Sequence, residues 1–138
     1  MTPEAGAALG PWVVESVSPA AMADFAEVLA DPNPIHLDPE AVKAMGLGDR
    51  VVNQGPANFG YVLEMLKAAV PGATVVDLRV RLQANVFGGD RVIAAGVVES
   101  VADGEHGTRI LNCAVWLDVD GGARAIAGTA SLILSQNP

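Results

Sequence analysis

The sequence of 138 residues contains few aromatic, cysteine and basic residues, and several common classes of protein function depend on these residue types. Aromatic residues make up only 4% of the chain although 51% of it is hydrophobic, so the core has to be built from Ala, Val, Leu and Ile. A chain of this length can bury such a core as one domain without disulfide bonds. A small and apolar chain often hides part of its surface in an oligomer, and a deep apolar pocket would serve equally well.

The scarcity of cysteine limits the redox and metal chemistry of the chain. Cys113 is the only cysteine, which excludes an internal disulfide bond and a cysteine-rich metal site. Cys113 alternates with Leu111 and Val115. We therefore interpret it as a small buried hydrophobic residue rather than a nucleophile.

Positive charge and long apolar runs are scarce as well. Eight Lys and Arg residues stand against 16 Asp and Glu residues, and the formal net charge is −8. The basic residues form no cluster, which argues against a nucleic-acid partner, although a few local arginines could still bind a phosphorylated small ligand. The stretch MTPEAGAALG has no basic leader region, and no apolar stretch approaches the roughly 20 residues of a membrane span. We expect a cytoplasmic protein without membrane association.

Proline divides the first half of the chain into short elements. Ser18 and Asp38 each precede a proline, as an N-cap residue does before a proline in the first helical position. Asp31 also precedes a proline, which disfavours the α region and ends the preceding helix. The predicted elements are a strand at 11–17, a helix at 19–30, and a short helix at 39–45 with Gly46 as its left-handed cap.

The second half of the chain begins with an apolar helix, GPANFGYVLEMLKAAVPG, at residues 55–72. Apolar residues cover nearly all of its faces, and only Asn58, Glu64 and Lys67 are strongly polar, which indicates a buried helix. Short turns separate the strand-like segments that follow, as in an antiparallel meander. These segments lie at 76–86, 91–102, 108–119 and 123–134. The order predicts an α+β fold in which one antiparallel sheet wraps around a central buried helix, the hotdog arrangement.

The stretch DPNPIHLD, residues 31–38, concentrates the titratable chemistry of the chain. It contains one of only two histidines, and its prolines fix φ and remove backbone donors, so the loop is stiff. A carboxylate at Asp31 held near the imidazole of His36 can orient the ring or share a water molecule with it for acid–base chemistry. The residues alone leave a second interpretation open, in which Asp31 and Asn33 cap the turn and His36 bonds locally.

Three stretches resemble one protein family. ADPNPIHLDPEAVKAMGL resembles the signature of the MaoC-like (R)-specific enoyl-CoA hydratases, which reads G-D-x-N-P-[aliphatic]-H before a helix of small residues. VVNQGPANFGYVLEML resembles the glycine-led central helix of that family, and VRLQANVFGGDRVIAAGVV resembles the strand, turn and strand that follow it. The resemblance runs through about residues 12–134 in order. It implies a single MaoC-like hotdog domain over residues 1–138.

The resemblance implies a reaction and a role for each matched residue. Asp31 and His36 would be the catalytic pair, which adds water syn across a trans-2-enoyl thioester to give the (R)-3-hydroxyacyl-CoA, or runs the reverse dehydration. Asn33 would be structural. Negative charge develops on the thioester oxygen, so a donor has to wait there. The backbone N–H of Gly55 at the start of a helix fits this role, and merely starting the helix is the alternative.

Two positions depart from the family pattern. The family usually has His-Gly-Met where this chain has Gln54-Gly55-Pro56, and it usually has proline at the position of Asn85. We expect Gln54 to help position the substrate. No cofactor and no metal are expected, because one imidazole and one carboxylate make a poor metal site.

The partners implied are an acyl-CoA or acyl-carrier-protein thioester and further hotdog subunits, in a homodimer, a larger oligomer or a heteromeric assembly. Two other functions stay open. A hotdog acyl-CoA thioesterase would depend on Glu64 rather than His36, and a non-catalytic partner subunit of a heteromeric hydratase would show no turnover alone. The presence of both Asp31 and His36 favours the active half of such an assembly.

The remaining candidates are assigned to the surface. His106 lies among turn residues in DGEHGT and is expected to be exposed, and DVDGG at 118–122 is expected to be a hairpin turn rather than a calcium loop. Arg79, Arg81 and Arg91 could meet CoA phosphates, although alternating strand arginines usually form a solvated face.

Overall fold

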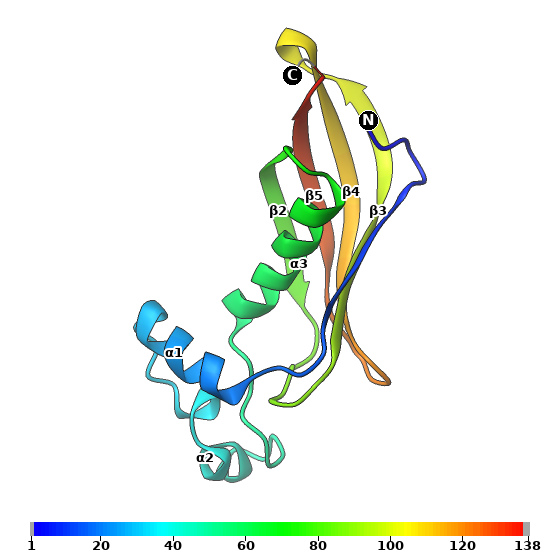
Figure 1. Cartoon of the computed structure of the whole chain (residues 1–138). Coiled ribbons are helices and arrows are strands. Elements are labelled where there is room, and N and C mark those ends of the chain that lie inside the picture. The colour runs from blue at the N-terminus through cyan, green and yellow to red at the C-terminus, as the bar shows by residue number, and fades with distance from the viewer. Residues whose placement is uncertain (1, 137–138) are drawn as a thin grey trace.

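The computed structural model describes residues 2–136 and consists of one antiparallel sheet with a helix packed against one of its faces (Figure 1). The five strands are hydrogen-bonded in the order β1-β3-β4-β5-β2. They are β1 (Ala8–Val14), β2 (Thr74–Leu82), β3 (Val92–Asp103), β4 (Thr108–Val119) and β5 (Arg124–Ser135). The helix on the sheet is α3 (Gly55–Ala69). The predicted α+β hotdog arrangement is confirmed.

The first two strands begin and end elsewhere than predicted. The sequence predicted a strand at 11–17, but β1 covers Ala8–Val14 and contains Pro11 at an irregularity in its pairing with β3. Proline is tolerated there because β1 is an edge strand. The alternation at 76–86 predicted a longer strand, but β2 ends at Leu82 because the next two backbone N–H groups, of Gln83 and Ala84, both point to Ala125 O.

The predicted four-strand meander is correct for only three strands. β3, β4 and β5 are consecutive neighbours, whereas β2 pairs with β5 at the opposite edge from β1. The segment between β2 and β3 does not fold as a hairpin. It returns instead to the residues before α3, where Asn53 donates to Val86 O at 2.7 Å and Val52 forms an isolated bridge with Phe87.

The caps predicted for the two shorter helices are present. The N-cap Ser18 accepts from Ala21 N at 3.1 Å, and Asp38 accepts from Glu40 N at 2.9 Å. Gly46 has φ +70°, the left-handed conformation expected of it. The helical elements besides α3 are α1 (Pro19–Leu29), the 3-10 helix η1 (Pro34–His36), α2 (Pro39–Ala44) and the 3-10 helix η2 (Glu105–Gly107).

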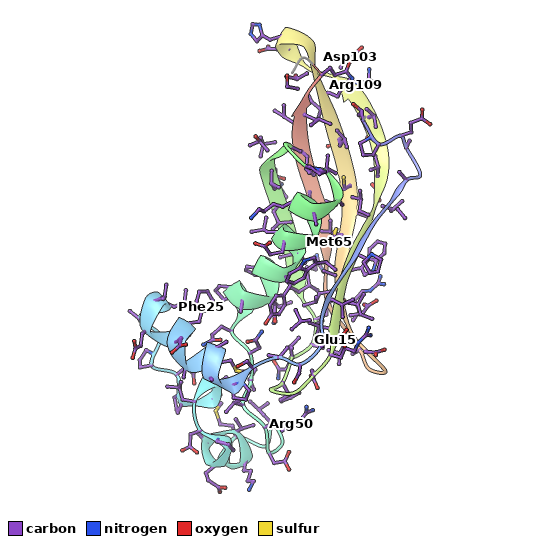
Figure 2. The ribbon with its side chains drawn as sticks, in the orientation of Figure 1. Glu15, Phe25, Arg50, Met65, Asp103 and Arg109 are labelled. Atoms are coloured by element: carbon purple, nitrogen blue, oxygen red, sulfur yellow. The ribbon has the colours of Figure 1, made fainter. Side chains whose placement is uncertain are left out.

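The core lies between α3 and the inner face of the sheet. Met65 is fully buried on the side of α3 that faces the sheet (Figure 2). Gly96 lies beneath it, and glycine is needed there because a Cβ atom would lie 2.5 Å from Ala114 O of β4, whereas its 3.5 Å distance from Met65 Cε would be an ordinary contact. Around this contact the core is aliphatic, as the composition predicted. It includes Val62, Leu66, Val92, Ala94, Val98, Leu111, Cys113, Val115, Leu117, Ile126, Ala130 and Leu132.

Residues 15–54, here called the connecting segment, join β1 to α3. Its helices α1 and α2 project beyond one end of the sheet (Figure 1). Backbone hydrogen bonds tie it down, from Val17 N to Asp90 O at 2.9 Å and from Gly88 N to Val51 O at 2.8 Å. Arg50 adds an ion pair to Asp90 at 2.8 Å. Of the helices within residues 2–136, none has both the length and the hydrophobicity that crossing a membrane demands.

Candidate active site

Asp31 and His36 stand at the two ends of the stiff loop that follows α1. Ala30 ends the helix in the left-handed conformation with φ +50°, and Asp31 N donates to Ala26 O at 3.0 Å. Beyond it, Asp31 Oδ1 accepts from Asn33 N at 3.1 Å, and Asn33 Oδ1 accepts from Ile35 N at 3.3 Å. The turn-capping interpretation is therefore correct for Asp31 and Asn33, yet it occupies only one oxygen of the aspartate.

The second oxygen of Asp31 faces His36. Asp31 Oδ2 lies 3.6 Å from His36 Nε2, and the Asp31 side chain is 38% exposed whereas that of His36 is 10% exposed. The loop thus brings together the two side chains that the sequence singled out. A separation of 3.6 Å exceeds an ordinary hydrogen bond, so the two groups are neighbours that a small donor can bridge.

The backbone of Val52 determines which nitrogen of His36 carries the proton. His36 Nδ1 lies 2.5 Å from Val52 O. Because a carbonyl oxygen only accepts, Nδ1 must donate, and a neutral ring then presents its lone pair at Nε2. Nε2 and Asp31 Oδ2 are in that state two acceptors side by side. Such a pair suits a molecule with two donated hydrogens, such as water.

Val52 is itself held by the elements around it. Val52 N donates to Ile35 O at 2.9 Å, so both backbone groups of Val52 are hydrogen-bonded to residues of η1. The bridge from Val52 to Phe87 connects the same residues to the loop before β3. Val52 was not predicted as a site residue, because its contribution is a backbone carbonyl 16 residues from His36 and no side-chain pattern marks such a contact.

Gly55 is the first residue of α3, three positions after Val52. Its N–H has no hydrogen-bond partner among residues 2–136. The fold does not require glycine here, since φ is outside the left-handed region and a Cβ atom would meet only Leu82 Cδ1, at 3.4 Å. The absent side chain leaves the N–H at the positive end of the helix open to approach.

Gln54, which was expected to help position the substrate, is the residue that precedes α3. Its side chain does not cap α3 and is 1% exposed. Its Nε2 donates to Met22 O at 2.8 Å, which joins α3 to α1, while Oε1 has no hydrogen-bond partner among the described residues. An unpaired buried acceptor costs about 1–3 kcal/mol unless a donor reaches it.

An apolar cavity of about 340 Å³ lies between α1 and α3, with Gln54 in its wall. Trp12 and Tyr61 stack at 6.1 Å on one side of it. Phe25 of α1 (Figure 2) also lines this cavity. These aromatic residues were not predicted to belong to a site, although three of the chain's six aromatic side chains line this cavity. The low aromatic content of the chain, 4%, is the sequence feature that could have drawn attention to them.

The three predicted site groups are not all in one cavity wall. Asp31 lines a second cavity of about 490 Å³ with Ala23, Glu27 and Leu37. Neither His36 nor Gly55 belongs to the wall of this cavity or of the apolar one. His36 is instead linked to Gly55 through Val52, whose carbonyl oxygen is bonded to His36 Nδ1 and which precedes Gly55 by three residues.

The minor candidates lie where the sequence placed them. His106 is exposed, and Cys113 is buried in the sheet, where burial first and the negative charge of Glu99 second raise the pKa of its thiol. Glu64 lines the apolar cavity and pairs with Lys67 at 3.3 Å. Nowhere in residues 2–136 do three or more His, Cys, Asp or Glu side chains gather in a way that could hold a metal ion.

A sheet of five antiparallel strands around one helix, with its polar loop beyond the end of the sheet, defines a hotdog-fold protein. Residues 4–112 match the family model described as MaoC like domain, and the chain belongs to this family. The (R)-hydratase from A. caviae involved in PHA biosynthesis is a structural neighbour, with a TM-score of 0.84 and 24% identity over 96% of this chain and 98% of that one. The ChsH1-ChsH2 complex from Mycobacterium tuberculosis superimposes with a TM-score of 0.81 and 21% identity, over 97% and 99%.

Curated relatives match over part of their length. A mitochondrial 3-hydroxyacyl-[acyl-carrier-protein] dehydratase from Arabidopsis thaliana is 32% identical over 78 residues, which is 56% of this chain and 45% of that protein. The chain spans about half the length of the curated relatives it matches.

Proposed function

We propose that the protein hydrates trans-2-enoyl thioesters to (R)-3-hydroxyacyl thioesters, or catalyses the reverse dehydration. The observation that carries the proposal is the pairing of Asp31 Oδ2 with a His36 ring whose Nδ1 is bonded to Val52 O. Membership of the MaoC-like family and the dehydratase from Arabidopsis thaliana among the relatives support this reaction class.

The proposed chemistry begins with a water molecule between Asp31 and His36. The lone pair on His36 Nε2 can take a proton from that water as its oxygen bonds to the β-carbon of the enoyl group. The resulting imidazolium lies beside the Asp31 carboxylate, which stabilises its charge. The pair then returns a proton to the α-carbon, so that one water is added and no net proton is released.

The electrons of the carbon–carbon double bond move onto the thioester oxygen during the attack. The Gly55 N–H is proposed as the donor to this oxygen, supported by its lack of a protein partner and its place at the start of α3. The reaction uses only the thioester and water, and no cofactor is proposed.

Substrate positioning is proposed for Gln54 and the apolar cavity. The aromatic and aliphatic lining of the cavity suits an acyl chain, and the unpaired Gln54 Oε1 would favour a chain with a donor at that depth. Asn33 is proposed to act structurally, because its side chain accepts from Ile35 N within the loop. Homomeric or heteromeric assembly with other hotdog subunits is proposed as well, by likeness to the ChsH1-ChsH2 complex.

The test measures hydration of crotonyl-CoA and of a longer enoyl-CoA by the purified chain. Asp31→Asn and His36→Ala are each expected to lower kcat by about 100-fold to 10,000-fold, the range for removal of an acid–base group. The matched control is His106→Ala, which changes the exposed histidine and should keep the wild-type rate. Near wild-type hydration by both site variants would show that this mechanism is wrong.

The same assay separates the two alternatives. A thioesterase would release free CoA, detected with a thiol reagent, and would lose activity in Glu64→Gln rather than in His36→Ala. A partner subunit would show neither product alone and would gain turnover only with a second hotdog chain.

A further inference from the structure

The peptide between Val52 and Asn53 forms hydrogen bonds through both of its polar groups. Its carbonyl oxygen, Val52 O, accepts from His36 Nδ1. Its N–H, which belongs to Asn53, donates to Val86 O at 2.7 Å. Hydrogen bonds in such a chain polarise one another, so the bond at the N–H strengthens the carbonyl oxygen as an acceptor. The orientation of this one peptide therefore determines where the His36 ring is held and which of its nitrogens keeps the proton.

The side chain of Asn53 joins this peptide to α3. Its Nδ2 donates to Asn58 Oδ1 at 2.8 Å and to the hydroxyl oxygen of Tyr61 at 3.1 Å. Asn53 and Asn58 are 5% and 3% exposed, so their bond is made in a low-dielectric interior, where it is stronger than in water. Tyr61 in turn stacks on Trp12 of β1. The Asn53 amide thus connects the peptide beside His36 to the helix and the sheet of the core.

The loop that contains His36 takes its position relative to α3 from hydrogen bonds. Between residues 23 and 50 no side chain belongs to the apolar core. Asp31 Oδ1 and Asn33 Oδ1 accept from backbone N–H groups within the loop, whereas both backbone groups of Val52 bond to the loop from outside it. The placement of the imidazole relative to Gly55, the first residue of α3, consequently depends on the peptide that Asn53 anchors.

We infer that Asn53 is a positioning residue for His36. By holding the peptide between α3 and the imidazole, its amide keeps Nδ1 protonated and the Nε2 lone pair beside Asp31 Oδ2. It also fixes that lone pair relative to the Gly55 N–H, because α3 carries both Gly55 and the partners of the amide. A displacement of about 1 Å between reacting groups can cost on the order of 100-fold in rate. The effect on rate rests on the proposed function, and the effect on the ring does not.

The first measurement is the tautomer of His36, read from ¹⁵N NMR of the imidazole nitrogens. The chain has only two histidines, so the spectrum of His106→Ala assigns the signals. At mildly alkaline pH, where an imidazole is neutral, the wild type should show a protonated Nδ1 and an unprotonated Nε2. In Asn53→Ala the two signals should move toward each other, because the carbonyl oxygen is no longer held in place and both tautomers become populated.

The second measurement is the hydration of crotonyl-CoA by the same variants. Asn53→Ala should lower kcat by about tenfold and change KM by less than about twofold, because it displaces the ring and not the short substrate. The matched control is Asn112→Ala, which removes an exposed amide that bonds to Ser100 and Ser131. Asn112 lies on β4, outside the candidate site, so this variant should keep both the single tautomer and the wild-type rate.

Removal of Asn53 alone leaves the buried Asn58 Oδ1 without its donor, which costs stability. If that variant does not fold, Asn53→Ala/Asn58→Ala removes both members of the bond and should give the same mixed tautomers. An unchanged tautomer in a folded variant, an equal change in Asn112→Ala, or mixed tautomers without a fall in kcat would each overturn the inference. If the wild type did not hydrate crotonyl-CoA, the proposed function would fail, and the NMR measurement would still decide the role of Asn53.

Discussion

The sheet with α3 and the connecting segment of residues 15–54 are held together by different forces. Between the sheet and α3 the contacts are aliphatic, and side chains such as Met65, Leu111 and Leu117 have no exposed surface. The connecting segment contributes three residues to that core, Val17, Met22 and Val51, and its residues 23–50 contribute none. Val42 of α2 is fully buried but packs outside the main cluster. Besides the three core side chains, hydrogen bonds and the Arg50–Asp90 pair join the segment to the rest.

This difference separates stability from chemistry within one small chain. Burial of apolar surface is the dominant favourable term in folding, so the sheet and α3 determine most of the global stability. Asp31 and His36 lie within residues 23–50, which add no side chain to the apolar core, and a hydrogen bond joins His36 to Val52 O. Segments with few buried apolar contacts open locally at lower cost than the core. The candidate site therefore depends on a part of the molecule that can change with little effect on the fold.

The largest effect expected from this comparison is on the core. Leu66→Ala removes a fully buried side chain of α3 and should lower the free energy of unfolding by about 2–5 kcal/mol, from lost burial and the cavity left behind. Urea denaturation measures it. The matched control is Leu37→Ala in the connecting segment, where the side chain is 46% exposed and the change should stay near 0.5 kcal/mol. Equal losses in the two variants would contradict the division.

A smaller and more local effect is expected from the buried valine of the connecting segment. Val42→Ala should lower the local stability of residues 34–52 by about 1–2 kcal/mol, since the Val42 side chain is the fully buried one of α2. Hydrogen exchange should quicken at the amides of His36, Leu37 and Val52, while amides of β4 keep their protection. Val28→Ala, at a position that is 78% exposed, is the control. Faster exchange throughout β4 would show that the two regions unfold as one unit.

The two regions also differ in how far the sequence predicted them. Local signals determined the helix starts at Ser18 and Asp38 and the apolar helix from Gly55, because caps and periodicity act within a few residues. They also placed Asp31 and His36 on one stiff loop. The pairing of β2 with β5 and the bond from His36 to Val52 O were not predicted. Both join segments that are distant in the sequence, and neither depends on a residue type that would mark it.

The smallest expected effect concerns the thiol inside the sheet. Burial raises the pKa of Cys113 above its ordinary value of 9.0, so the folded state holds this proton more tightly than the unfolded chain does. This contribution to stability is complete below the ordinary pKa and is lost as the pH rises through the folded pKa. Between pH 7.5 and 9.5 the free energy of unfolding should fall by less than about 1 kcal/mol more in the wild type than in Cys113→Ala.

The reactivity of the same thiol sharpens the contrast between the regions. At pH 8 a disulfide reagent should modify Cys113 only when the sheet opens, because the buried thiol is neutral and covered. A cysteine placed at Leu37 in a Cys113→Ala background should react on the order of 100-fold faster, since that position is 46% exposed. If the two thiols react at similar rates, the sheet interior opens as readily as the loop that contains the candidate site. The separation of stability from chemistry would then not hold.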